Sequence, residues 1–181
     1  MSASVFSFAP LGVVGACVFL ALLAAAVASD VRTRRIPNRI VALLALAGVV
    51  FSVATRGVEG GLVAGLTGLG AGLVLWLPLF VIGAMGAGDV KLFAAAGAWL
   101  GPERALVGAL LAALVGGALG VVWLLRTHGV ARGRARFATA LRPSARRGVD
   151  TSSSRPLPYG VAMALGAAGA AWLPRFISGG G

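Results

Sequence analysis

Two aspartates are the residues best suited to chemistry in this chain, because acidic side chains are scarce and these two lie among apolar residues. The chain has five acidic residues in 181. Asp89 lies within MGAGDVKLFAAAGAWL, residues 85–100, and Asp30 closes a long apolar run that begins near residue 9. A carboxylate near hydrocarbon costs at least a few kcal/mol, so an acid in the membrane is by default a functional candidate. If the fold brings the two together, they can share one proton and divide acid and base roles.

Each aspartate also has a structural interpretation. Asp30 can be an interfacial residue that pairs with one of three nearby arginines: Arg32, Arg34 or Arg35. Asp89 can be neutralised by Lys91, or it can cap the N-terminus of the helix that follows, where free backbone N–H groups favour an acid. Both interpretations remain open from the sequence.

Three glycines around Asp89 favour a role in a site: Gly83, Gly86 and Gly88. Without side chains they permit positive φ and a close approach of another backbone beside Asp89. Unwound backbone at membrane depth is tolerated only where it is buried in protein or lines a wet cavity. Lys91, two residues after Asp89, should point to a different side of a helix and mark the membrane interface.

The composition indicates which elements hold these residues. The chain is 59% hydrophobic with a mean hydropathy of +0.95, which is more apolar than a soluble domain of this size can bury. A helix needs about 20 residues to cross a bilayer. Apolar segments at about 9–29, 40–55, 61–83, 90–100, 105–125 and 158–177 therefore predict an all-α polytopic membrane protein with six transmembrane helices and a short fourth helix. We expect one integral membrane domain over residues 1–181, with Glu59, Glu103 and Asp150 in its loops.

The basic residues predict an orientation. With six crossings and both termini outside, thirteen of the sixteen basic residues face the cytoplasm, eight of them in a basic loop at about 126–157. If the fourth segment were re-entrant, seven would lie inside and nine outside, and the bias would vanish. In the favoured arrangement with six crossings, the short fourth helix should tilt little, extend through Gly88 or Gly101, or lie in thinned membrane. This orientation places Asp30 and Asp89 at the cytoplasmic face.

Several classes of function are disfavoured. The net charge of +11 comes without interleaved aromatic residues or a recognisable binding module, so we expect no nucleic acid as a partner and expect the basic loop to contact anionic lipid headgroups. One cysteine, Cys17, forms no internal disulfide, and with one histidine, His128, no Cys/His metal site can be assembled. We expect neither a metal nor a cofactor.

Three motifs carry a resemblance to a known family. GAGDVKL resembles the glycine-x-glycine-aspartate motif of the intramembrane aspartyl peptidases, with Gly86, Gly88 and Asp89 at its defined positions. SDVRTRRIPN is similar to the segment of type IV prepilin peptidases in which an aspartate, here Asp30, precedes isoleucine-proline-asparagine, here Ile36, Pro37 and Asn38. PLPYGVAMALG resembles the proline-aromatic-glycine opening of that family's last helix, here Pro158, Tyr159 and Gly160.

The resemblance covers about residues 10–177 in the family's order. Presenilin-type proteases share the GxGD motif but resemble the chain less, because their first aspartate usually follows a tyrosine and Asp30 follows Ser29. The large bifunctional members add an N-terminal region with paired CxxC motifs and an N-methyltransferase activity. This chain resembles the short, peptidase-only members that serve Flp/Tad pili, competence pseudopilins or archaeal preflagellins, and its size and composition favour the Flp/Tad type.

The resemblance implies a function. Asp30 and Asp89 would be the catalytic pair of an aspartic endopeptidase that cleaves the basic leader of a prepilin or pseudopilin at the inner (cytoplasmic) membrane. Pro37 would start the second helix, with Asn38 as a local cap or backbone ligand. The alternative is a transport or channel subunit in which the two aspartates relay protons or a cation.

The predicted orientation can be tested with reporter fusions. Because thirteen of sixteen basic residues fall on one side, reporters near residue 58 and after residue 177 should be external and one near residue 140 cytoplasmic. The measurement is the activity of alkaline phosphatase and fluorescent-protein fusions at the three sites. An external reporter at 140 would contradict the shared face of the two aspartates.

Overall fold

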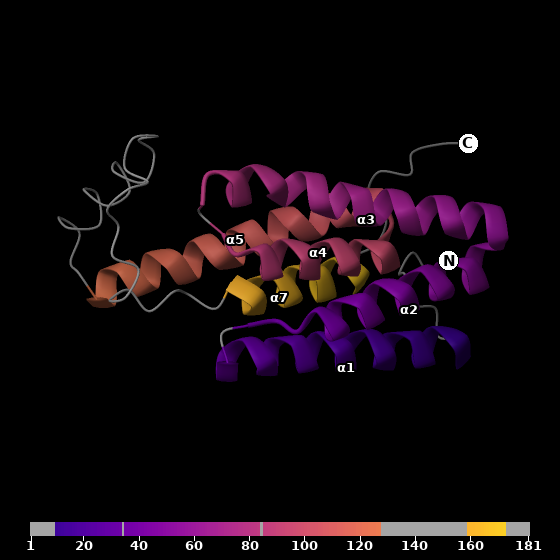
Figure 1. Cartoon of the computed structure of the whole chain (residues 1–181), viewed down its shortest axis with the longest axis horizontal. Helices are drawn as coiled ribbons and strands as arrows, with labels where there is room; N and C mark the ends of the chain where they lie inside the picture. Colours follow the sequence, from indigo (N-terminus) through magenta and orange to yellow (C-terminus); the bar gives the residue numbers. More distant parts are fainter. Residues whose placement is uncertain (1–9, 34, 84, 128–158, 173–181) are drawn as a thin grey trace.

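The structure is a computed structural model that describes residues 10–33, 35–83, 85–127 and 159–172 (Figure 1). Within these ranges the chain forms helices and no strand, which confirms the all-α prediction. The helices are α1 (Pro10–Thr33), α2 (Asn38–Arg56), α3 (Val58–Val81), α4 (Ala87–Leu100), α5 (Pro102–Thr127) and α7 (Tyr159–Trp172). Apart from its first two residues, which end α5, the predicted basic loop at 126–157 lies outside the described residues, as does Pro158.

Four of the helices are long and apolar enough to cross a membrane: α1, α2, α3 and α5. The prediction of a polytopic membrane protein is therefore confirmed. The predicted short fourth helix is present as α4, which has 14 residues and includes Gly88. At about 1.5 Å per residue it is about 21 Å long, less than the roughly 30 Å hydrocarbon core. The described part of α7 also has 14 residues, so length alone supports four of the six predicted crossings.

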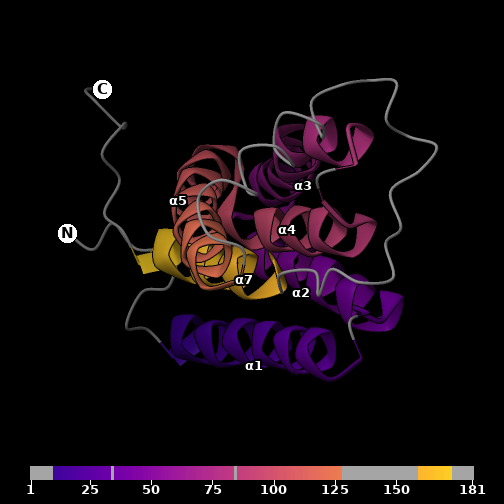
Figure 2. The ribbon, with the colours of Figure 1, turned by 90° about the vertical axis from the view of Figure 1, so that its left-hand side faces the viewer.

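Helix α4 lies at the centre of the bundle. Figure 2, which views the bundle from one end, shows α4 between α2, α3, α5 and α7, with α1 on the outer side of the bundle. Every residue from Leu92 to Leu100 is buried, whereas α1, α2, α3 and α5 expose many leucines and valines. The neighbouring helices therefore cover α4 and replace lipid around it. A helix that is too short for the bilayer is stable in this position because protein surrounds it from Leu92 to Leu100.

Glycines allow α3 to approach α4 closely. Gly68 of α3 and Gly97 of α4 face each other, and a Cβ on either one would collide with the backbone carbonyl oxygen of the other. One turn further along, a Cβ on Gly72 would lie 2.9 Å from the Cα of Ala94. Small residues at such crossings let two backbones pack directly, which is a main source of helix association in membranes.

At one end of the bundle, each of two helix pairs is joined by a single glycine. Gly57 links α2 to α3 with φ of 80°, and Gly101 links α4 to α5 with φ of 77°. Both values lie in the left-handed region, which glycine adopts without a steric penalty. Our expectation that Glu59 and Glu103 lie in loops is wrong, because these connections leave no loop and both residues lie in the first turn of a helix. Free N–H groups there favour an acid. Asp150 lies outside the described residues.

A pair of glycine substitutions in α3 tests the close crossing. Gly68→Ala would place a methyl group against the backbone of α4, so α3 and α4 must separate, at a cost of about 1–3 kcal/mol for overpacking. The same change at Gly70, whose Cβ position has no neighbour within 4 Å, should be neutral or slightly stabilising. Thermal unfolding of the purified variants in detergent measures the difference. Equal midpoints for the two variants would contradict the crossing.

Candidate active site

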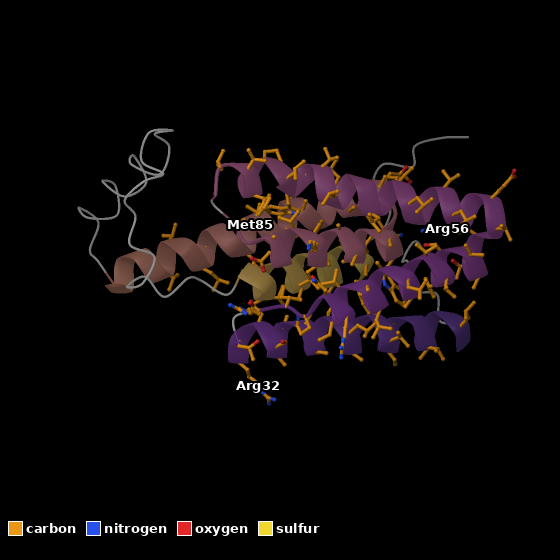
Figure 3. All side chains as sticks on the ribbon, viewed as in Figure 1. Arg32, Arg56 and Met85 are labelled. Carbon is orange, nitrogen blue, oxygen red and sulfur yellow. The ribbon has the colours of Figure 1, made fainter. Side chains whose placement is uncertain are left out.

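The end of α1 and the start of α4 lie at the same end of the bundle. Figure 3 labels Arg32, in the last turn of α1, and Met85, just before α4, at one end and Arg56 at the other. Asp30 lies in the last two turns of α1, and Asp89 lies in the first turn of α4. The two aspartates come from distant parts of the sequence, and the negative charge of Asp30 acts on the carboxylate of Asp89.

Neither carboxylate is neutralised by a described basic side chain. Asp30 and Asp89 are both partly buried. Among the described residues, neither forms an ion pair with Arg32, Arg35 or Lys91, and Arg34 lies outside the described ranges. Lys91 is exposed, as expected for a residue on a different side of α4 from Asp89. The structure therefore does not support the interpretation that Asp30 and Asp89 form surface ion pairs with Arg32, Arg35 or Lys91.

Asp89 does contact the start of its own helix. Its carboxylate accepts a hydrogen bond from the backbone N–H of Gly86, the N-cap residue of α4. Asp89 is the third residue of the helix, and this is the contact that an acid at that position makes in a capping box. A Cβ on Gly86 would lie 3.3 Å from Asp89 Oδ2, so the glycine leaves room for the carboxylate. This contact supports the capping interpretation, and it directs the carboxylate toward the start of α4.

Asp30 is held by the first turn of α7. Its carboxylate accepts a hydrogen bond from the backbone N–H of Gly160. The Oδ2 atom is buried and has no hydrogen-bond partner among the described residues by geometric criteria. A Cβ on Gly160 would lie only 2.7 Å from Oδ2, so a residue with a side chain could not occupy this position without moving the carboxylate. Tyr159 is the first residue of α7.

The segment between α1 and α2 is fastened to both aspartate-bearing helices. The hydroxyls of Ser29 and Thr33 donate hydrogen bonds to the carbonyl oxygen of Arg35, at 3.0 and 3.1 Å. Ile36 packs over Gly88 of α4, where a Cβ would lie 3.6 Å from the Cβ of Ile36. Ile36 thus brings the segment that follows Asp30 against the turn that carries Asp89.

The two remaining residues of this motif begin α2. Pro37 is the N-cap, with extended backbone at φ of −61° and ψ of 131°, and its carbonyl oxygen accepts the backbone N–H of Ile40 at 3.0 Å. The prediction that Pro37 starts the second helix agrees with the structure. Asn38 is the first helical residue and is exposed, so the cap position belongs to Pro37 and a cap by Asn38 is wrong.

The glycines before Asp89 meet our expectation in part. Gly83 has φ of 77° and makes the turn after α3. Gly86 has φ of −75° and Gly88 lies inside α4, so neither uses the left-handed region. Because they lack side chains, Gly86 leaves room for the carboxylate of Asp89 and Gly88 leaves room for Ile36.

The chain matches the type IV leader peptidase family over residues 17–121, a range that contains both aspartates. The chain belongs to the type IV leader peptidase family. Proteins described as prepilin leader peptidase/N-methyltransferase from two strains of Burkholderia pseudomallei are each 34% identical to it over 171 residues. The alignment covers 90% of this chain and 46% of each relative, so the chain spans about half their length. No solved structure matches the chain.

Some residues of the site were not evident from the sequence. Ser29 and Thr33 look like ordinary polar residues near the end of an apolar helix, and the returning backbone of Arg35 gives their hydroxyls a role in the site. A serine and a threonine four residues apart near a helix end are only a weak indication that the following segment folds back onto the helix. Such residues often bond to carbonyl oxygens of their own helix instead. Thr33 also does this, with the carbonyl oxygen of Ser29 at 2.9 Å.

Proposed function

We propose that this member of the type IV leader peptidase family is a membrane-embedded aspartic endopeptidase. It removes the leader peptide from prepilin-like substrates, of the Flp/Tad type, at the cytoplasmic face of the inner membrane. The observation that carries the proposal is the meeting of Asp30 and Asp89 at one end of the bundle, each oriented by a glycine N–H. The peptidase named in the description of the Burkholderia relatives supports it.

The chemistry follows from two neighbouring carboxyl groups. Two close carboxylates resist being ionised together, so the pair shares one proton. The ionised carboxylate takes a proton from a water molecule, which attacks the scissile carbonyl carbon. The protonated carboxyl donates a hydrogen bond to the oxyanion that develops and then supplies the proton to the leaving amine. Asp30 and Asp89 titrate and act as one unit.

The position of the pair suits a substrate with a short leader and an apolar helix. Asp30 lies near the end of a helix long enough to span the bilayer, so the pair sits at the level where a membrane helix emerges. The apolar helix of a prepilin can lie in lipid beside the enzyme while its leader junction reaches the two carboxyl groups. The exposed valines and leucines of α1 offer an apolar surface for such a helix.

The sharpest test replaces each aspartate by asparagine. Asp30→Asn and Asp89→Asn keep the size of the side chain but remove proton exchange, so cleavage of a prepilin should fall by at least about 10²–10⁴-fold, as for the loss of a general acid or base. Asp→Glu should also fail, because a carboxyl displaced by about 1 Å can cost about 10²-fold. The measurement is the appearance of shortened pilin in detergent with purified protein.

A matched control separates this effect from general loss of charge. Glu59 is an exposed acid in the first turn of α3, three residues after Arg56 and thus at the opposite end of the bundle from the pair, so Glu59→Gln should cleave normally. Asn variants should unfold no earlier than the parent, because a neutral amide avoids the desolvation of an acid. Near-normal cleavage by Asp89→Asn would contradict the peptidase and leave Asp89 as a helix cap. If the parent protein carried a proton or cation flux and cleaved no prepilin, and the Asn variants lost that flux, the transport alternative would be favoured.

Gly160 gives a second, independent test of the site. Gly160→Ala puts a methyl group against Asp30 Oδ2, and the carboxylate must move because it is the free end of a side chain. Cleavage should fall by about 10²-fold while the unfolding midpoint stays close to that of the parent. Gly117→Ala, at a helical position with no neighbour within 4 Å, is the control and should cleave normally. Full activity in Gly160→Ala would show that its contact with Asp30 has no role in catalysis.

A further inference from the structure

A recess at the other end of the bundle gathers charged side chains that the proposed peptidase does not use. Residues of α2, α3, α4 and α5 line a space of about 230 Å³. Three of the lining residues are charged: Arg56, Glu103 and Arg104. Figure 3 shows Arg56 at the end of the bundle opposite Met85, and thus opposite the two aspartates. Ala64, Leu100 and Pro102 give the rest of the lining an apolar character.

The two arginines converge on the junction between α4 and α5. Nη1 of Arg56 lies 3.3 Å from the place that a Cβ on Gly101 would occupy, so the glycine leaves room for the guanidinium. Arg104, in the first turn of α5, is 9% exposed. Guanidinium groups bind phosphate oxygens through paired N–H donors, and free backbone N–H groups at a helix start add to the attraction.

The third charged residue restricts the choice of ligand. Glu103 lines the same recess and would repel a ligand that carries only negative charge. A ligand with a phosphate beside a primary ammonium matches all three side chains, because the carboxylate can accept hydrogen bonds from the ammonium. The arrangement of charges therefore fits a zwitterion better than a simple anion.

The depth and size of the recess indicate the source of such a ligand. The span Asn38–Arg56 ends here and the span Pro102–Val122 begins here, so the recess lies at a membrane–water boundary. Its volume is below the roughly 300–1,000 Å³ typical of pockets for drug-sized ligands, which suits a headgroup whose chains remain in lipid.

We propose that this recess binds the headgroup of an aminophospholipid, with the phosphate on Arg56 and Arg104 and the primary ammonium on Glu103. The site lies at the opposite end of the bundle from Asp30 and Asp89 and does not depend on the peptidase. A bound headgroup would fasten the ends of α2 and α5 to one leaflet.

Lipid retention measures this binding directly. The protein is reconstituted in nanodiscs with equal amounts of phosphatidylethanolamine, phosphatidylglycerol and phosphatidylcholine, extracted into detergent, and examined by native mass spectrometry. We expect phosphatidylethanolamine to be retained about tenfold over the other two, since phosphatidylglycerol has no ammonium and the choline ammonium has no N–H to donate. Equal retention of all three lipids, or a preference for phosphatidylglycerol, would overturn the proposal.

Variants assign the binding to the recess. Arg56→Gln should reduce retention of phosphatidylethanolamine about tenfold, and because Arg56 is exposed the variant should fold normally. Glu103→Gln should remove the preference over phosphatidylglycerol. The controls are Glu59→Gln, an acid at the same end outside the recess lining, and Arg39→Gln, at the other end of α2. Equal losses in variants and controls would overturn the assignment.

A soluble headgroup distinguishes lipid from a free metabolite. Glycerophosphoethanolamine carries the same phosphate and ammonium without acyl chains, and its effect on the unfolding midpoint is measured in lipid-free detergent. We expect no shift at concentrations where phosphatidylethanolamine raises the midpoint. An equal shift by the soluble compound would overturn the lipid as the ligand.

Discussion

The direct contact of the α3 and α4 backbones is the interaction on which the rest of the structure depends. Helix α4 is too short for the bilayer and is stable because protein surrounds it. Gly68 and Gly97 allow α3 to lie against it without intervening side chains. This crossing sets the depth of α4, and the depth of α4 sets the depth of Asp89 in its first turn.

The second carboxylate depends on a different kind of restraint. Asp30 belongs to α1, which lies on the outer side of the bundle in Figure 2. Two local contacts compensate for this position: the N–H of Gly160 holds the carboxylate, and Ile36 packs on Gly88. Asp89 is thus fixed by a helix that is buried from Leu92 to Leu100, and Asp30 by a helix that buries Phe19, Leu23 and Ala26 and by the contacts at the end of the bundle. Asp30 Oδ2 is buried, has no hydrogen-bond partner among the described residues and lies 2.7 Å from the place of a Cβ on Gly160, which shows how closely α7 covers Asp30.

The sequence predicted most of the architecture and part of the site. Long apolar runs indicated the all-α membrane fold and the short fourth helix, because length and hydropathy are local properties. The motifs identified Asp30, Asp89 and their flanking residues. The contact of Gly160 with Asp30 and the bonds of Ser29 and Thr33 to Arg35 depend on chain segments that meet only in the folded protein. The expected left-handed backbone was found at Gly83 but not at Gly86, where the glycine instead leaves room for a neighbouring side chain. The sequence alone does not distinguish these two uses of a glycine.

The single-glycine connections have a consequence for enzymes that act on this protein. A protease binds its substrate as an extended strand of several residues, and Gly57 and Gly101 each supply one non-helical residue between two helices. To be cut there, the chain would have to unwind the last turn of α2 or α4, and in α4 that turn is buried. At this end of the bundle, the two described connections are therefore protected by their shortness, whichever side of the membrane they face.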